Sequence, residues 1–319
     1  MSPAMADESD VLDALPHAER IRSRKLIGGV ATVIADASGL PKAQRDRLER
    51  ELHDAALALP GVTEARIAVT AAEPSRTLIA IGSGKGGVGK STVAANLAIA
   101  MARAGKKVGL VDADVYGPSQ PTLLGSSEKP TAEDDRLIPV AAHGLKFLSL
   151  GHLVSPGHAL AWRGPMATGA LAKLIDADWG DAELLIVDLP PGTGDVQLSL
   201  IQRSRPAGAV IVSTPQDLSL IDARRAVDLF NKMSVPILGI IENMATYECP
   251  HCGGESHPFG TGGAEAAAAE LGVPFLGRLP LSLTIREESD GGRPPAASGG
   301  PESDAFAAIA AKLLEAVAH

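Results

Sequence analysis

The chain has 319 residues, of which 45% are hydrophobic, and its 29 lysines and arginines against 38 aspartates and glutamates give a formal charge of −9 at pH 7. This composition is typical of a folded globular protein, and the negative balance argues against nucleic acid or an anionic membrane as a partner. With two cysteines, a polar N-terminus and no long apolar run, the sequence predicts no disulfide framework, signal peptide or membrane span, so we expect a cytoplasmic protein.

Residues 1–73 are expected to form a small α/β segment of their own, since a domain takes roughly 150 residues and the length leaves room for an appendage. Three patterns indicate structure in it, namely an apolar run, a charged helix and a strand, at Gly28–Ile34, Lys42–Leu59 and Val62–Val69. Ala71–Pro74 is typical of a linker. It is expected to lead into a second domain, residues 74–319.

From Thr77 onward, short apolar runs bounded by Gly or Pro alternate with helix-length segments. This alternation predicts a doubly wound, mostly parallel α/β sheet with helices on both faces. The runs expected to be buried strands are 78–81, 108–111, 184–189, 209–213, 236–242 and 274–279. We also expect a hairpin around His143-Gly144, within the insert 126–149, and a last helix over Phe306–Val317 whose apolar stripe docks on the sheet.

The segment after the first of these strands has the pattern G-x-x-x-x-G-K-S, from Gly84 to Ser91. Between a strand and a helix this pattern predicts a phosphate-binding loop for ATP with Mg²⁺. Its backbone N–H groups converge on phosphate, Lys90 supplies charge and the Ser91 hydroxyl suits the metal. A plain glycine-rich turn is the alternative. The predicted nucleotide-binding residues are Gly84, Lys85, Gly86, Gly87, Val88, Gly89, Lys90, Ser91 and Thr92.

A second lysine, Lys85, directly follows the first glycine of the loop. Two cations this close are costly unless both face a polyanion, so Lys85 is expected to contact phosphate as well, including that of a second subunit. The alternative is a solvated lysine.

Polar residues end or follow three of the other predicted strands, at the edge where open α/β sheets bind ligands. We expect Asp188 to hold Mg²⁺, with the N–H of Gly192 meeting the γ-phosphate, and Asp112 to be a second candidate for the magnesium shell. Asp114 is expected to orient the attacking water, and Asn243 to contact a base edge. Structural or capping roles are the alternative for the aspartates, and a turn-forming role for the asparagine.

Both cysteines lie in one short segment, Cys249-Pro-His-Cys252, which Gly253-Gly254 follows. A thioredoxin-like dithiol is disfavoured, because the glycines make a helix improbable there. A zinc site within one chain would need His251 and His257 at an irregular spacing. Two chains related by a two-fold axis would instead bring four thiolates together, enough for zinc or a four-iron cluster. Two buried thiols without a ligand are the remaining alternative.

Taken together, these segments resemble the Mrp/ApbC-type ATP-binding iron–sulfur cluster carriers, within the wider group of MinD/ParA-like ATPases with a deviant phosphate loop. The similarity runs from Thr77 to about Pro294 and rests on Lys85–Ser91, Asp112–Ser119, Trp162–Met166, Asp188–Asp195, Ser213–Gln216, Glu242–Met244, Cys249–Cys252 and Pro258–Gly260. The resemblance implies a homodimer in which Lys85 reaches across an ATP sandwich. It also implies that Cys249 and Cys252 bridge a 4Fe–4S cluster between subunits, for delivery to client apoproteins.

The N-terminal segment departs from this pattern. Many members of the family carry a small domain there with an acidic motif and a cysteine, whereas residues 1–73 contain no cysteine, so we expect a shortened or degenerate version.

The main rival hypothesis is a MinD/ParA-like switch that dimerises with ATP and recruits a partner or surface, with a structural zinc at the cysteines. Such switches use a basic amphipathic tail or a basic face, and Phe306–His319 has only a plain apolar stripe. The sequence therefore predicts an ATP-hydrolysing cluster carrier without a nucleic-acid or membrane partner.

Overall fold

The computed structural model describes residues 10–40, 42–70, 76–153 and 164–318. The predicted linker Ala71–Pro74 lies outside these ranges, as do Trp162 and Arg163 of one segment that carries the resemblance. The chain divides into two compact units, Met1–Ser75 and Arg76–His319. In the described ranges, no helix combines the length and the apolar character that crossing a bilayer requires.

The first unit is a three-stranded sheet with one long helix. Two short 3-10 helices, η1 (Asp10–Ala14) and η2 (Ala18–Arg20), precede the strands β1 (Ile21–Ile27), β2 (Val30–Asp36) and β3 (Glu64–Thr70), and α1 (Lys42–Leu57) lies between β2 and β3. β1 is antiparallel to β2, and β3 is parallel to it. The helix and the last strand were expected, and together with β2 they enclose a separate core that includes Leu12, Val33 and Leu52.

The sequence patterns did not indicate β1, for a physical reason. Four consecutive residues of this strand are exposed and three of them are charged, so it lacks the alternation of a half-buried strand. Its pairing depends on the turn at Gly28 and Gly29, where φ is +56° and +81°. Both values lie in the left-handed region that favours glycine.

The second unit is built on an eight-stranded sheet with the order β15-β12-β11-β4-β10-β5-β9-β8. Every neighbouring pair is parallel except β8 and β9. The strands are β4 (Thr77–Gly82), β5 (Val108–Asp112), β8 (Val140–Ala142), β9 (Leu145–Ser149), β10 (Leu184–Asp188), β11 (Gly208–Ser213), β12 (Ile237–Glu242) and β15 (Phe275–Arg278). The six expected strands are present, each within one residue at either end, which confirms the predicted mostly parallel α/β sheet.

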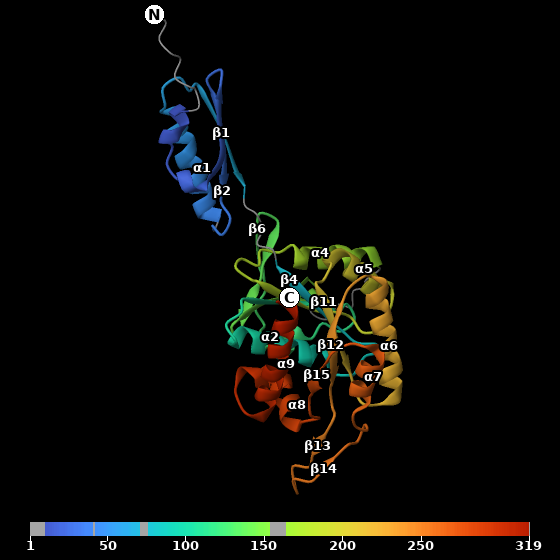
Figure 1. Cartoon of the computed structure of the whole chain (residues 1–319). Helices are drawn as coiled ribbons and strands as arrows, with labels where there is room; N and C mark the ends of the chain where they lie inside the picture. The colour runs from blue at the N-terminus through green and yellow to red at the C-terminus, as the bar shows by residue number, and fades with distance from the viewer. Residues whose placement is uncertain (1–9, 41, 71–75, 154–163, 319) are drawn as a thin grey trace, which may run out of the picture. The chain divides into compact units, whose positions relative to one another are not determined.

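Helices cover both faces of this sheet (Figure 1). On one face lie α2 (Lys90–Arg103) and α9 (Pro301–Val317), and on the other α4 (Gly164–Ile175), α5 (Asp195–Ser204), α6 (Asp217–Lys232) and α7 (Gly263–Leu271). Short helices complete the unit at α3 (Gln120–Leu123), η3 (Leu150–Leu153), α8 (Leu283–Asp290) and η4 (Pro295–Ala297). Phe306, Ile309 and Leu313 of α9 are buried in the same core as Ile79 and Ile81 of β4. The last helix therefore docks on the sheet as predicted.

The hairpin expected around His143-Gly144 joins β8 to β9, with both turn residues at positive φ and Ala142 opposite Leu145. β9 also pairs with β5, so the hairpin extends the main sheet, which the sequence did not indicate. A second hairpin, β6 (Thr131–Glu133) with β7 (Arg136–Ile138), precedes it. A third, β13 (Tyr247–Glu248) with β14 (Glu255–Ser256), carries the cysteines and lies beyond the ends of the sheet in Figure 1.

Candidate nucleotide site and cysteine hairpin

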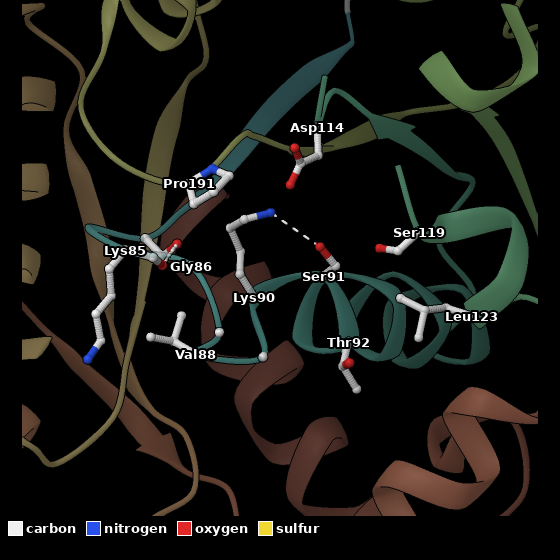
Figure 2. A pocket seen from close by; sticks show the side chains of 13 residues that line it. Lys85, Gly86, Val88, Lys90, Ser91, Thr92, Asp114, Ser119, Leu123 and Pro191 are labelled. Atoms are coloured by element: carbon white, nitrogen blue, oxygen red, sulfur yellow. Dashed lines mark hydrogen bonds between the residues drawn. The ribbon is translucent and has the colours of Figure 1, made fainter. Parts of the chain in front are cut away.

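The predicted phosphate loop leaves β4 in the interior of the sheet and enters α2, at the carboxyl ends of the parallel strands. It borders a cavity of about 260 Å³ (Figure 2). Every predicted loop residue from Lys85 to Thr92 lines this cavity, together with Ser83, Asp114, Ser119, Leu123 and Pro191. The remaining predicted loop residue, Gly84, packs instead against α6.

Two of the loop glycines are required by close packing. A Cβ at Gly84 would overlap the backbone carbonyl of Asp222 on α6. Gly89 has φ +78°, and a Cβ there would overlap the side-chain nitrogen of Asn243. Gly86 differs from both, since the nearest atom to its Cβ would be a carbon of Pro191 at 3.9 Å. The loop therefore has one tolerant glycine and at least two that are fixed by their neighbours.

Lys90 forms a buried ion pair with Asp188, although 98 residues separate the two in the sequence. The lysine side chain is 5% exposed and the aspartate is fully buried. The Nζ atom of Lys90 also lies 3.3 Å from the hydroxyl of Ser91, toward which the lysine points in Figure 2. A buried carboxylate is strongly destabilising without a partner, so Lys90 compensates the charge of Asp188 in this structure.

Asp112 and Asp188 are neighbours, because β5 and β10 pair in a register that places these two terminal residues side by side. Asp112 accepts hydrogen bonds from the backbone N–H of Gln120 at 3.0 Å, the hydroxyl of Ser149 at 2.9 Å and the N–H of Asp114 at 3.2 Å. Burial, followed by the nearby charge of Asp188, raises the pKa of Asp112 to about 7. Two carboxylates thus share one buried edge of the sheet with a single lysine.

This donor set fits Mg²⁺, which proteins usually bind through one or two carboxylates together with substrate phosphates. Oxygen ligands are available from Asp188, Asp112 and the hydroxyl of Ser91. The side-chain oxygen of Gln120 is also buried and has no hydrogen-bond partner among the residues that the structure describes, which marks an incompletely satisfied polar site. Gln120 and Ser149 were missed by the sequence analysis, since nothing in their local pattern distinguishes them from other polar residues.

Asp114, Gly192 and Lys85 were also predicted to act at this site. Asp114 lines the cavity, and its Oδ1 accepts the N–H groups of Tyr116 and Gly117 in a tight turn. The N–H of Gly192 donates to the carbonyl of Ser83 at 3.0 Å, so a contact with phosphate requires that bond to open.

Lys85 lines the same cavity, but Figure 2 shows its side chain pointing away from that of Lys90. Its Nζ lies 3.5 Å from the side-chain oxygen of Gln216, which precedes α6. Within one chain, the two lysines therefore do not converge on one point.

Asn243 follows β12 and is buried against the phosphate loop, where its Nδ2 donates to the carbonyl of Val88 at 2.8 Å. The next residue, Met244, has φ +59°, and its terminal methyl lies 3.6 Å from the position of a Cβ at Gly89. Asn243 and Met244 thus brace the phosphate loop at the point where the chain turns toward the cysteine hairpin. The expected contact of Asn243 with a base edge stays a prediction.

The two cysteines lie in the loop of the β13–β14 hairpin, with Cys249 half-buried and Cys252 exposed. The Cys249 backbone donates to the carbonyl of Gly254, and that of Gly253 donates to the carbonyl of Cys249. The backbone N–H groups of His251 and Cys252, followed by the side chain of Cys252, lower the pKa of the Cys249 thiol. This arrangement stabilises a thiolate, the form that binds metal.

The structure bears on each alternative role of the cysteine pair. No helix starts at the cysteines, as a thioredoxin-like dithiol would require, and neither thiol is fully buried. The ring Nδ1 of His257 donates to the carbonyl of Ala245 at 3.0 Å, and its Nε2 lies 3.5 Å from Glu255 Oε1. Over the described ranges, no group of three or more His, Cys, Asp or Glu side chains is placed to hold a metal ion. One chain therefore presents two thiols of an incomplete ligand set.

The chain is similar to a known protein family and to a curated relative over most of its length. The ParA family, described as the NUBPL iron-transfer P-loop NTPase, matches residues 75–314. An iron-sulfur cluster carrier protein of Deinococcus radiodurans is 44% identical over 311 residues, which cover 94% of this chain and 87% of the relative, so the match extends into the N-terminal unit.

Solved structures show the same fold. A nucleotide-binding protein of Archaeoglobus fulgidus, solved with ADP, is 38% identical with a TM-score of 0.59, covering 71% of this chain and 89% of its own. The septum site-determining protein MinD of Pyrococcus horikoshii, complexed with Mg-ADP, is 24% identical with a TM-score of 0.56 and covers 74% and 95% of the two chains. The second similarity shows the fold alone.

Proposed function

We propose that this chain, which belongs to the ParA-type family of NUBPL iron-transfer P-loop NTPases, is an ATP-hydrolysing iron–sulfur cluster carrier that transfers a labile cluster to client apoproteins. The observation that carries the proposal is the exposed two-thiol hairpin in the same compact unit as a complete phosphate loop. The name of the Deinococcus relative supports the same function. The free thiols suit a reducing compartment, in keeping with the expected cytoplasmic location.

The cluster is proposed to lie between two copies of the chain. A four-iron cluster takes four thiolates, and each chain supplies Cys249 and Cys252. A two-fold axis near the hairpins completes the set without any further residue. The two backbone N–H groups that point at the Cys249 sulfur favour the thiolate needed for this bond.

Nucleotide binding is proposed to rearrange the charges at the sheet edge. Lys90 pairs with Asp188 in this structure, and phosphate at the loop would draw the lysine toward the anion. Asp188 would then be left with uncompensated charge, which Mg²⁺ held by Asp188, Asp112 and Ser91 would balance. When bound, the metal neutralises phosphate charge and polarises the oxygens of the transferred group. Nucleotide and metal are therefore expected to bind cooperatively.

The remaining predicted residues have roles that fit their positions. Asp114 faces the cavity and would orient the attacking water. Lys85 points away from Lys90 in Figure 2 and would meet the phosphates of a second subunit. Gly192 would supply its N–H to the γ-phosphate once its bond to Ser83 opens.

A short covalent path joins the nucleotide site to the cysteines. Asn243 bonds to Val88 of the phosphate loop, and Cys249 follows only six positions later. The intervening segment is fixed to the body of the unit, since Ala245 donates to the carbonyl of Leu279 and Leu281 to that of Thr246. A change in the phosphate loop would thus reach the base of the hairpin through Asn243, which provides a physical route for coupling hydrolysis to cluster loading or release.

Cluster transfer to an acceptor tests this function. The protein is reconstituted with iron and sulfide without oxygen and mixed with an apoprotein whose activity requires a four-iron cluster. Wild type and the His251→Ala control, which keeps both thiols, should restore acceptor activity. Cys249→Ala should not, while still binding ADP.

Equal transfer by Cys249→Ala would contradict the proposal. Tightly bound, colourless zinc in place of a cluster would favour a MinD/ParA-like switch with a structural metal.

A further inference from the structure

Gln120, the first residue of α3, lies across both buried carboxylates of the nucleotide site. Its side-chain nitrogen donates to Asp188 Oδ2 at 2.9 Å and to the backbone carbonyl of Ser91 at 3.0 Å. Its backbone N–H donates to Asp112 Oδ2 at 3.0 Å. One residue thus connects the ends of β5 and β10 with the first turn of α2.

The orientation of the Gln120 amide follows from its neighbours. Both groups near the nitrogen, the Asp188 carboxylate and the Ser91 carbonyl, are hydrogen-bond acceptors, so the NH₂ group must face them. The amide oxygen then has no hydrogen-bond partner in the described part of the chain, although the residue is 0% exposed. A buried carbonyl without a partner is destabilising.

The hydrogen bonds of the Gln120 amide bear on both folding and the nucleotide site. An apolar side chain of similar length would avoid the unpaired oxygen, but it would leave Asp188 Oδ2 and the Ser91 carbonyl without the hydrogen bonds that the amide donates. Metal binding must therefore be measured apart from stability. The two hydrogen bonds of the nitrogen fix the Asp188 carboxylate and the backbone of Ser91, and both residues supply ligands to the metal in the proposed function. An acidic residue could not replace it, because a third carboxylate would lie beside Asp112 and Asp188.

We infer that Gln120 is a positioning residue of the magnesium site, holding the Asp188 carboxylate and the Ser91 backbone in the arrangement that binds the metal with nucleotide. The inference rests on the proposed nucleotide-hydrolysing function. Groups that orient metal ligands by hydrogen bonds typically change metal affinity by about 10–100-fold when they are removed.

The test is a Gln120→Met variant of the full chain, which keeps the length of the side chain and removes the amide. Gln197→Met is a matched control, because Gln197 is 1% exposed on α5 and neither of its amide atoms has a partner within the described ranges. Binding of Mn²⁺, as a paramagnetic substitute for Mg²⁺, is measured in the presence of ADP by counting free Mn²⁺ with electron paramagnetic resonance. Binding of ADP alone is measured in EDTA, and thermal unfolding reports the fold.

We expect Gln120→Met to weaken Mn²⁺ binding by about 10–100-fold, with an unchanged ADP affinity in EDTA. The thermal midpoint should fall, with the variant still folded at the assay temperature, because Asp188 Oδ2 and the Ser91 carbonyl lose a buried donor. Gln197→Met should bind Mn²⁺ like wild type. Should Gln120→Met unfold, Gln120→Leu provides a second apolar variant to which the same expectation applies.

Wild-type Mn²⁺ affinity in the folded Gln120 variants would overturn the inference. So would an equal loss of Mn²⁺ affinity in the Gln197 control, or an equal loss of ADP affinity in EDTA, because either would indicate a general structural role. A wild-type protein that binds neither ADP nor Mn²⁺ would overturn the proposed function and this inference together. Normal wild-type binding with unaffected Gln120 variants would overturn the inference alone.

Discussion

Substitution of Gly89 by alanine tests whether the phosphate loop is built as described. Gly89 has φ +78°, and its missing Cβ leaves room for the Asn243 amide that donates to Val88 at 2.8 Å. Alanine would meet two penalties. The left-handed backbone costs about 1–2 kcal/mol for a residue with a Cβ, and displacement of Asn243 would remove a buried hydrogen bond contributing about 1 kcal/mol.

The expected loss of unfolding free energy for Gly89→Ala is therefore about 2–3 kcal/mol. For a unit of this size, that corresponds to a decrease in the thermal midpoint of roughly 4–12 °C. Gly86→Ala is the matched control from the same loop, since its Cβ would have nothing closer than Pro191 at 3.9 Å. Urea unfolding of the two variants and of wild type measures the difference.

A double-mutant cycle sharpens the test, because Asn243→Ala removes both the obstructing side chain and the hydrogen bond. In that background Gly89→Ala should cost about 1 kcal/mol less than in wild type. The reasoning is refuted if Gly89→Ala is no more destabilising than Gly86→Ala, or if its cost is the same with and without Asn243.

Three further predictions concern titration and domain independence. The first concerns Cys249 in metal-free Cys252→Ser protein, which keeps the backbone N–H at position 252. Because backbone N–H groups lower the pKa of the Cys249 thiol, its alkylation by iodoacetamide should have a pH midpoint below that of free cysteine. A midpoint at or above the value of free cysteine contradicts this. The raised pKa of Asp112 means that the folded state keeps its proton where the unfolded state has lost it. Between about pH 4 and pH 7 in EDTA, wild type should therefore lose stability relative to Asp112→Asn as pH rises, as measured by urea unfolding; a difference between the two that does not change with pH speaks against it. A fragment of residues 76–319 should fold and bind ADP like the full chain, since this unit has its own cores; an unfolded fragment would show that the N-terminal unit is required.

Local sequence patterns were sufficient to predict the central strands and the phosphate loop. Strands such as β4 and β10 are apolar on both faces and end at Gly or Asp, so strand, loop and helix can be located without tertiary information. β1 was missed because its charged residues are exposed and its pairing depends on a turn. The pairing of β9 with β5 was missed because it joins segments more than 30 residues apart.

The same difference between local and tertiary information applies to the nucleotide site. The sequence predicted that Asp112 and Asp188 act at one edge, and the strand register places them side by side. It did not predict that Lys90 would pair with Asp188, that Lys85 would point away from Lys90, or that Gln120 would bridge both carboxylates. These relations are tertiary, and each depends on how distant segments meet at the carboxyl edge of the sheet.

Two chains are proposed to share one cluster through Cys249 and Cys252. The most direct measurement is the iron and sulfide content per dimer after anaerobic reconstitution, with the mass of the species determined by light scattering. We expect about four irons and four sulfides per dimer, present in His251→Ala and lost in both Cys249→Ala and Cys252→Ala. A cluster that persists in either cysteine variant, or iron bound stoichiometrically by a monomer, would contradict it.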